Sequence, residues 1–203
     1  MIKGIPFVVS APSGTGKTTA CKILRERFPE LKFSVSHTTR SPRHNEVDGK
    51  CYHFISETKF KDKMDKGEFL EWANVHTNYY GTAIDTINSH IQKGEDLLLD
   101  LDVQGVQSLR KMNFSGVFIF LLPPSFDELY NRLKKRGTES PEVIQQRMEV
   151  GKKEMEQYRL YDYVVINNNL EETVANLIAI IHAERCRATR YNPIVQSIVT
   201  PNK

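Results

Sequence analysis

The sequence has few cysteines, little net charge and no long hydrophobic run. Its three cysteines, Cys21, Cys51 and Cys186, lie far apart and lack the paired spacing of a metal site, so we expect reduced thiols. The formal net charge of +3 is too small to indicate a surface that binds nucleic acid. No apolar run approaches the roughly 20 residues that a membrane-spanning helix needs. We therefore expect neither nucleic acid nor a membrane as a partner.

The chain is long enough for one domain of ordinary size with a substantial core, because it has 203 residues, of which 39% are hydrophobic. The N-terminal stretch MIKGIPFVVSAP is apolar but shows no cleavage pattern of small residues, so it predicts a first strand rather than a secretory signal. A cytoplasmic protein is the expectation that follows.

Short, continuous apolar runs alternate with helical patterns along the chain. The runs are IPFVVS, DLLLDLD, GVFIFLL and DYVVIN, and strands that are buried on both faces have this composition. Strands that alternate with helices predict an α/β fold with a parallel β-sheet flanked by helices. The stretch LEETVANLIAIIHAERCRATR, residues 170–190, predicts one long amphipathic helix.

Two insertions interrupt this α/β pattern. Residues 34–82 alternate short strands with turn signals around one helical segment, which predicts a small α+β subdomain. Residues 125–162 are charged and helical, with Ser125 and Ser140 placed as helix caps, and such an insertion over a sheet edge often serves as a lid. The core is then expected to comprise residues 1–33, 83–124 and 163–203.

A glycine-rich segment, SAPSGTGKTT, follows the first predicted strand and precedes a predicted helix. In that context it predicts a phosphate loop, whose backbone N–H groups and helix N-terminus cradle phosphate oxygens. Lys17 would hold the transferring phosphate, and the Thr18 hydroxyl would enter the shell of a magnesium ion bound with ATP. Ala11 replaces the first glycine of the GxxxxGK[ST] pattern, and a glycine-rich turn without a ligand is the alternative. The candidate ATP-binding residues of the loop are Ala11, Pro12, Ser13, Gly14, Thr15, Gly16, Lys17, Thr18 and Thr19.

A second candidate site follows the buried run in LLLDLDVQG. Asp100 and Asp102 come at its C-terminal end, where open α/β sheets bind their ligands. Carboxylates two residues apart on a strand point to the same side, so both are expected to face the cleft. We expect Asp100 to order the magnesium ion through a water molecule. The alternative for Asp102 is a cap for the helix that follows.

Several segments occur together in the order and at roughly the spacing of one enzyme family. They are SAPSGTGKTT, SVSHTTRSPR, GKCYHFI, EFLEWA, NYYGT, LLLDLDVQG and KRGTES. On these segments the chain resembles guanylate kinases, especially the bacterial type, from about residue 5 to residue 190. The resemblance implies a P-loop kinase core with a GMP-binding insertion at 34–82 and a lid at 125–162. It also implies transfer of the γ-phosphate of ATP to GMP, and to dGMP, with magnesium, which gives ADP and GDP in purine nucleotide metabolism.

The resemblance further implies roles for individual residues. The expected GMP-binding residues are Arg40, Arg43, Tyr52 and Tyr80 at the phosphate, Ser36, Glu71 and Thr82 at the guanine, and Asp100 and Asp102 beside them. The expected ATP-binding residues outside the loop are the lid arginines Arg132 and Arg136 and, near the adenine, Asn167. The expected catalytic residues are Lys17, Arg40, Asp100, Arg136 and Arg147.

The chemistry of guanine fits this assignment. Guanine presents adjacent N1–H and N2–H donors that one carboxylate such as Glu71 can accept, while the Ser36 hydroxyl can donate to O6. Adenine would set an acceptor against Glu71 and offers no 2-amino group. Sites built on such hydrogen bonds can reject analogues by ~10^4 or more.

Simpler roles stay open for several of these residues. Glu71 could be a solvated strand or helix residue, and Thr82 could be the N-cap of a helix that begins near Ala83. The lid arginines could be solvated surface charges, and Asn167 could be a loop cap. For the whole chain, the alternatives are a non-catalytic guanylate-kinase-like module that binds proteins and a different nucleoside monophosphate kinase. A monomer and a homo-oligomer are both compatible with the sequence.

Overall fold

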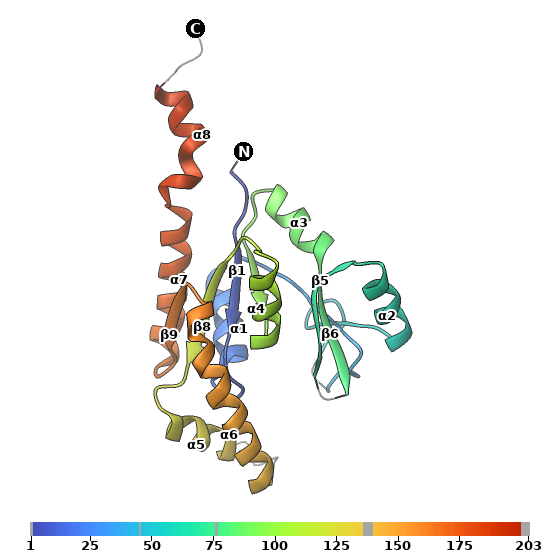
Figure 1. Cartoon of the computed structure of the whole chain (residues 1–203). Coiled ribbons are helices and arrows are strands. Elements are labelled where there is room, and N and C mark those ends of the chain that lie inside the picture. The colour runs from blue at the N-terminus through green and yellow to red at the C-terminus, as the bar shows by residue number, and fades with distance from the viewer. Residues whose placement is uncertain (1, 45, 76, 136–139, 200–203) are drawn as a thin grey trace.

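A parallel five-stranded sheet forms the centre of the molecule in a computed structural model that describes residues 2–44, 46–75, 77–135 and 140–199 (Figure 1). The strand order is β2-β7-β1-β8-β9, and each neighbouring pair is parallel. The strands are β1 (Pro6–Ser10), β2 (Lys32–Phe33), β7 (Leu97–Asp100), β8 (Val117–Leu122) and β9 (Tyr163–Ile166). The predicted α/β fold with a parallel sheet is confirmed, and β2 is an edge strand too short to show as an apolar run.

Helices cover both faces of this sheet. Side chains alternate between the faces along each strand, so the three inner strands each contribute to two hydrophobic clusters, one on each face. On β1, Phe7 and Val9 point toward α1 and α7, whereas Val8 points toward α3 and α4. All three side chains are fully buried, which is why the strand reads as a continuous apolar run. The helices are α1 (Lys17–Arg27), α3 (Ile84–Gln92), α4 (Val103–Lys111) and α7 (Leu170–Arg185).

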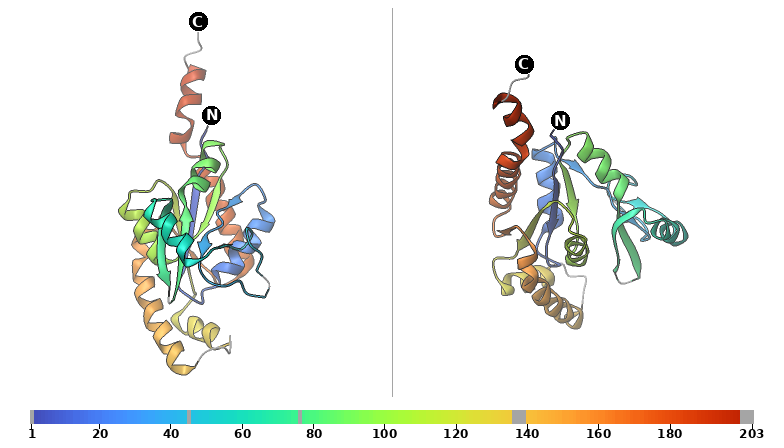
Figure 2. Two further views of the ribbon diagram at one scale, coloured as in Figure 1. Left: turned by 90° about the vertical axis from the view of Figure 1, so that its right-hand side faces the viewer. Right: turned by 45° about the horizontal axis from the view of Figure 1, so that its top comes forward.

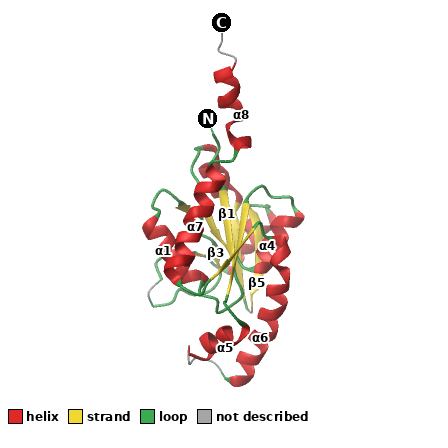
Figure 3. Ribbon diagram, turned by 90° about the vertical axis from the view of Figure 1, so that its left-hand side faces the viewer, coloured by secondary structure: helices red, strands yellow, loops and turns green. Residues whose placement is uncertain are grey.

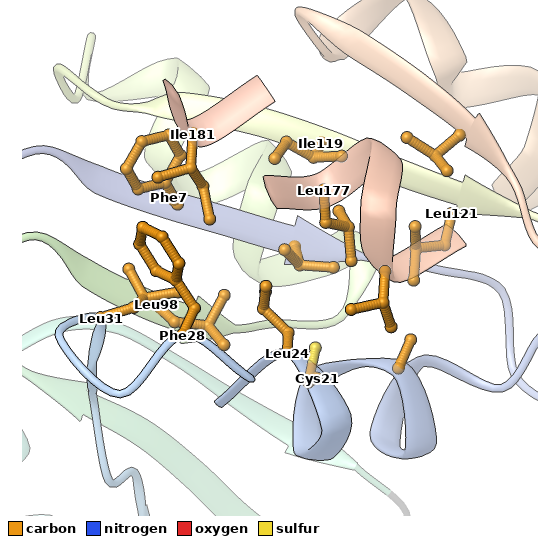
Figure 4. Close-up of a cluster of buried hydrophobic side chains, with 14 of the residues drawn as sticks. Phe7, Cys21, Leu24, Phe28, Leu31, Leu98, Ile119, Leu121, Leu177 and Ile181 are labelled. Carbon is orange, nitrogen blue, oxygen red and sulfur yellow. The ribbon is translucent and has the colours of Figure 1, made fainter. Parts of the chain in front are cut away.

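The cluster between β1, α1 and α7 fixes the start of α1. Figure 4 shows Leu24 of α1 and Leu177 and Ile181 of α7 turned toward the sheet residues Phe7 and Ile119. Burying one such side chain contributes about 1.5–3 kcal/mol relative to leaving it exposed. Because α1 begins directly after the glycine-rich segment, this packing also determines where that segment lies against the sheet.

A second, smaller sheet stands beside the core in the range predicted for the α+β subdomain (Figure 2). Its order is β4-β3-β6-β5, with β3 parallel to β4 and the other pairs antiparallel. Phe60 of the accompanying helix is buried and stacks on Phe69 with ring centroids 4.5 Å apart, which fastens the helix to the sheet. The elements are β3 (His37–Thr38), β4 (His53–Phe54), α2 (Glu57–Asp65), β5 (Phe69–Val75) and β6 (Asn78–Ala83).

The predicted lid consists of α5 (Phe126–Lys135), α6 (Pro141–Met155) and a 3-10 turn, η1 (Glu156–Leu160). The predicted caps are present, because the Ser125 hydroxyl accepts from the Glu128 N–H at 3.0 Å and the Ser140 hydroxyl accepts from the Val143 N–H at 3.5 Å. Four side chains, Leu129, Leu133, Ile144 and Met148, form a small core between α5 and α6. Figure 3 shows the two helices packed together beyond one end of the central sheet.

The single C-terminal helix predicted over 170–190 is wrong in its extent. The helix α7 ends at Arg185, and a separate helix, α8 (Ala188–Val199), follows after a break at Cys186. At the break the Arg187 N–H bonds the carbonyl three residues back, and the flanking arginines pair with buried carboxylates, Arg185 with Asp96 and Arg187 with Glu184. The last turn of α7 therefore closes with a bond between residues three apart, and the two arginines keep their ion pairs. The apolar spacing typical of a helix nevertheless continues in the sequence past this point. Among the described helices, none has both the length and the apolar composition to cross a bilayer.

The packing of α7 predicts a matched pair of substitutions with different costs. Ile181 in α7 is 1% exposed, whereas Ile198 in α8 is 71% exposed. Ile181→Ala should lower the free energy of unfolding by about 2–5 kcal/mol, since it leaves a cavity in the core, and Ile198→Ala should change it by no more than about 0.5 kcal/mol. Urea denaturation of both variants measures this, and equal losses would contradict the packing described above.

Candidate active site

The glycine-rich segment forms a loop between β1 and α1 that only glycine permits at two positions. Gly14 and Gly16 have φ values of 95° and 101°, in the left-handed region. A Cβ on Gly14 would lie 2.8 Å from Leu133 Cδ2, and one on Gly16 would lie 2.7 Å from Asn167 Nδ2. Ala11 is not among the described residues with positive φ, so an alanine is accommodated at the first position of the loop. The loop therefore wraps closely against α5 and against the residue that follows β9.

The N-terminus of α1 points its free N–H groups out of this loop. Gly16 is the N-cap and has no side chain, and no acidic residue lies in the first turn of α1. The first N–H groups of a helix lack intrahelical acceptors and carry the positive end of the helix dipole. One carboxylate does face the loop, because Glu154 of α6 accepts a hydrogen bond from the Ser13 N–H, and burial raises the pKa of Glu154. A helix N-terminus without an acidic first turn is suited to an anion.

Lys17, the first residue of α1, reaches the carboxyl end of β7. Its Nζ lies 2.6 Å from Asp100 Oδ1 and also donates to the Leu101 carbonyl. Burial lowers the pKa of Lys17, but its neighbours, Asp100 foremost, raise it, and the net pKa lies above its ordinary value, so the amine stays charged. Asp100 is brought to this place by the parallel pairing of β7 with β1, in which Val9 lies opposite Asp100.

A cavity of about 290 Å³ lies between this sheet edge and the second sheet. Ser36, Tyr52, Glu71 and Tyr80 come to it from the second sheet and its loops, whereas Lys17, Thr18, Asp100 and Asp102 come to it from the core. The structure thus brings together eight residues that the sequence placed in the loop, the magnesium site and the GMP site.

Glu71 is the most buried charged group of this cavity. It is 8% exposed, and its Oε1 accepts from the Thr82 hydroxyl at 2.6 Å, while the Ser36 hydroxyl lies 3.4 Å from that of Thr82. The pKa of Glu71 is raised to about 7, mainly by its removal from water; the Thr82 hydrogen bond lowers the pKa, and the nearby Asp102 contributes to raising it. The pairing of Glu71 with Thr82 across β5 and β6 fixes this arrangement.

The structure corrects one expectation, the placement of Asp102 on the strand, and excludes one alternative, the N-cap role of Thr82. Asp102 does not lie on the strand with Asp100, because β7 ends at Asp100 and Asp102 caps α4, accepting from the Gly105 N–H at 2.8 Å. It reaches the same cavity from the cap position. Thr82 is not the N-cap of α3, since that position is Ala83, and its hydroxyl is used on Glu71 instead.

Arg40 and Arg43 are held together just outside the cavity by one carboxylate. Arg40 pairs with Glu46 at 2.8 Å, and the Arg43 N–H donates to the other oxygen of Glu46 at 2.8 Å. Neither arginine is among the described residues that line the cavity. The Arg40 guanidinium nevertheless lies 5.6 Å from the ring centroid of Tyr52, which does line it.

The arginines of the predicted lid and Asn167 differ in what they contact. Arg132 of α5 donates to the carbonyls of Thr15 and Asn167, each at 3.0 Å, and its Nε donates to Glu128 at 2.8 Å. Arg147 is half-buried on α6, and Arg136 lies outside the described residues. Asn167 is not a loop cap, because Asn169 caps α7, and the Asn167 side chain donates to the Thr15 carbonyl at 2.7 Å.

The protein contributes few ligands to any metal ion by itself. In the described ranges no three His, Cys, Asp or Glu side chains lie close enough to hold a metal. Thr18 and Asp100 do line one cavity, and a hydroxyl and a carboxylate are oxygen donors of the kind that magnesium prefers. These residues fit a magnesium ion whose other ligands come from a nucleotide and water.

Comparison with known proteins identifies the family. The family model described as guanylate kinase matches residues 3–184. A guanylate kinase of Geobacter metallireducens is 47% identical over 188 residues, with 93% of each chain covered, and that of Geobacter sulfurreducens is 44% identical with 97% of each covered. The chain belongs to the guanylate kinase family.

Solved structures agree with this assignment. The crystal structure of guanylate kinase from Anaplasma phagocytophilum matches with a TM-score of 0.79 and 30% identity, covering 99% of this chain and 97% of that one. The SH3-kinase fragment of tight junction protein 3 matches with a TM-score of 0.50 and 13% identity, covering 92% of this chain and 60% of that one. The second match shows the fold alone.

Sequence reasoning did not find three residues that support this site. They are Glu46, which holds the arginines, Glu154, which faces the loop, and Thr173, which bonds the Asn167 side chain at 3.0 Å. Glu46 lies within a few residues of Arg40 and Arg43, so the local density of opposite charge was a usable signal. Glu154 and Thr173 belong to helices whose sequences carry no motif.

The raised pKa of Glu71 makes the stability of this guanylate kinase family member depend on pH. The pKa is about 7 in the folded chain against an ordinary value of 4.5, so the folded chain binds this proton more tightly than the unfolded chain does. Raising the pH from about 5 to about 8 should therefore lower the stability of the wild type relative to Glu71→Gln by on the order of 2 kcal/mol. Urea denaturation at both pH values measures it, and a constant or opposite difference would show that the pKa is not raised.

Proposed function

We propose that the chain transfers the γ-phosphate of ATP to GMP, and to dGMP, producing ADP and GDP. The observation that carries the proposal is the cavity with two chemically different ends. One end holds the buried Glu71, bonded to Thr82 beside Ser36, and the other holds Lys17, Thr18 and Asp100 next to the glycine-rich loop. The first end suits a nucleobase with adjacent donors, and the second suits phosphate.

The Glu71 end favours guanine over the other bases. The N1–H and N2–H groups of guanine would donate to the two oxygens of the Glu71 carboxylate, and the Ser36 hydroxyl would donate to O6. Thr82 keeps the carboxylate oriented from behind through its 2.6 Å hydrogen bond. A base without these donors would leave a buried carboxylate unpaired, which costs about 1–3 kcal/mol or more.

The phosphate of GMP would lie toward Tyr52 and Tyr80, whose rings meet edge to face at 5.8 Å on the cavity wall. The Arg40 guanidinium lies 5.6 Å from the centroid of the Tyr52 ring and would bind that phosphate once it replaces Glu46 as the partner of Arg40, with Arg43 three residues further along the chain as a second cation. Charge-assisted hydrogen bonds from guanidinium to phosphate are the strongest that these side chains form.

The transfer itself forms one bond and breaks one. An oxygen of the GMP phosphate bonds to the γ-phosphorus of ATP, while the bond from that phosphorus to the bridging oxygen of ADP breaks, and both electrons stay with ADP. Both substrates are anions, so the protein contributes mainly position and positive charge. Lys17, the first N–H groups of α1 and the arginines Arg40, Arg132, Arg136 and Arg147 would supply that charge, with Asn167 near the adenine.

Magnesium, when bound with ATP, would neutralise phosphate charge. The Thr18 hydroxyl and, through water, the Asp100 carboxylate would hold it. Asp100 is bonded to Lys17 at 2.6 Å, so it also keeps the lysine directed at the phosphate end of the cavity.

The proposal includes the setting as well as the reaction. We place the protein in the cytoplasm, with ATP and GMP as its partners and without nucleic acid or membrane, as a monomer or a homo-oligomer. The non-catalytic alternative is disfavoured because the loop keeps Lys17 and Thr18 together with two glycines, Gly14 and Gly16, that both have positive φ. A different nucleoside monophosphate kinase is disfavoured by the buried Glu71.

ATP-dependent production of ADP should occur with GMP and dGMP and be far slower with AMP, UMP, CMP or dTMP. Lys17→Ala should abolish turnover, because the charge nearest the transferring phosphate is lost, whereas Lys22→Ala, on the exposed side of the same helix, should not change it. A coupled ADP assay over the six acceptors measures both. No turnover with any acceptor would favour the protein-binding module, and a preference for AMP would refute the guanine assignment.

Glu71→Gln should mainly reduce selectivity for guanine. The amide offers one acceptor and one donor where guanine needs two acceptors, so the KM for GMP should rise by about ten- to a hundredfold. Glu57→Gln, an exposed carboxylate on α2, is the matched control and should leave the KM unchanged. If the Glu71 variant kept both the GMP KM and the preference over AMP, Glu71 would not read the base.

A further inference from the structure

The carbonyl of Thr15 in the phosphate loop is held by two side chains from distant parts of the chain. Asn167, which follows β9, donates its Nδ2 at 2.7 Å, and Arg132 of α5 donates its guanidinium at 3.0 Å. A carbonyl oxygen has two lone pairs, so both of its acceptor positions are filled. Arg132 also bonds the Asn167 carbonyl at 3.0 Å, which joins the three residues in one network.

Holding this carbonyl orients the neighbouring N–H group. In a trans peptide the C=O and the following N–H lie in one plane and point in opposite directions. With the Thr15 oxygen fixed toward Asn167 and Arg132, the Gly16 N–H must point to the other side, away from these two residues. Gly16 is the N-cap of α1 with a φ of 101°, so this peptide determines how the loop passes into the helix.

Thr173 sets the orientation of the Asn167 amide. Its hydroxyl lies 3.0 Å from Asn167 Oδ1, and the side chain is fully buried in the first turn of α7. The same hydroxyl lies 2.8 Å from the Asn169 carbonyl, and both oxygens can only accept, so the single threonine proton is shared between them in a three-centre hydrogen bond. A reversed amide would set Oδ1 against the Thr15 oxygen at the 2.7 Å now spanned by Nδ2, which would place two acceptors face to face.

We propose that Thr173 is a positioning residue for the phosphate loop, which it controls through Asn167 and the Thr15 carbonyl. Its ligand class is the polyphosphate of the donor nucleotide, and the base is not involved. The inference rests on the proposed phosphotransfer function, in which this loop binds ATP. It adds a loop-holding role for Asn167, because both ends of that amide are bonded within the protein.

The test compares Thr173→Val, which has the same shape without the hydroxyl, with Thr173→Ser, which restores the donor. Calorimetry measures the Kd of magnesium ATP and of magnesium tripolyphosphate, which has no base, and kinetics measure the KM for GMP. Thr173→Val should raise both Kd values by the same factor, roughly three- to tenfold for one lost hydrogen bond, while the GMP KM stays within twofold. Thr173→Ser should return both Kd values to within twofold of the wild type.

Two further variants keep the test decisive. Thr86→Val makes the same change at a half-buried position of α3 and should leave both Kd values unchanged. Asn167→Asp places an acceptor against the Thr15 carbonyl and should raise both Kd values at least as much as Thr173→Val does. This variant replaces Thr173→Val in the test if Thr173→Val does not fold. A rise in the ATP Kd without a rise for tripolyphosphate would overturn the inference, as would unchanged Kd values. Because these Kd values need no turnover, failure of the wild type to phosphorylate GMP would refute the proposed function separately.

Discussion

The parallel pairing of β1 with β7 is the constraint on which the site depends. It sets Val9 opposite Asp100, so the loop that follows β1 and the carboxylate that ends β7 meet at one edge of the sheet. Lys17 can then reach Asp100 at 2.6 Å as soon as α1 begins. The second sheet is inserted between β2 and β7, which are themselves paired, so its cavity opens onto the same edge. A shift of one residue in this register would turn Asp100 to the opposite face.

The positive groups at this edge are neutralised by the chain's own carboxylates. Lys17 is paired with Asp100, and Arg40 is paired with Glu46, each within 3 Å. Half-buried charges without partners would be costly, so such pairs stabilise the arrangement before a substrate arrives. Under the proposed function, GMP must replace Glu46 as the partner of Arg40. The gain on binding is then the difference between two ion pairs, which favours selectivity for a well-placed phosphate over raw affinity.

The parts of the fold that the sequence predicted are those set by local composition. Continuous apolar runs mark the central strands, since both faces are buried, and serine caps mark the starts of α5 and α6. The errors come from tertiary contacts. The helix predicted over 170–190 breaks at Cys186 where Arg185 and Arg187 pair with buried carboxylates, and no local pattern reports those partners. The placement of Asp102 differs in kind, because its contact is local: the strand ends at Asp100 and Asp102 caps the Gly105 N–H, which was the alternative that the sequence left open.

In the site, too, the sequence reveals side chains that belong to a local motif but not the distant residues that support them. A motif identifies residues by the side chains that face a ligand, and in this way the sequence predicted eight of the eleven residues that line the cavity. Asn167, 152 residues away in the sequence, donates to the Thr15 carbonyl. This bond orients the loop backbone whose N–H groups would bind phosphate under the proposed function. The close approach of that amide also explains the glycine at position 16, since a Cβ there would lie 2.7 Å from Nδ2. One tertiary contact thus accounts for both a residue of the motif and a residue far outside it.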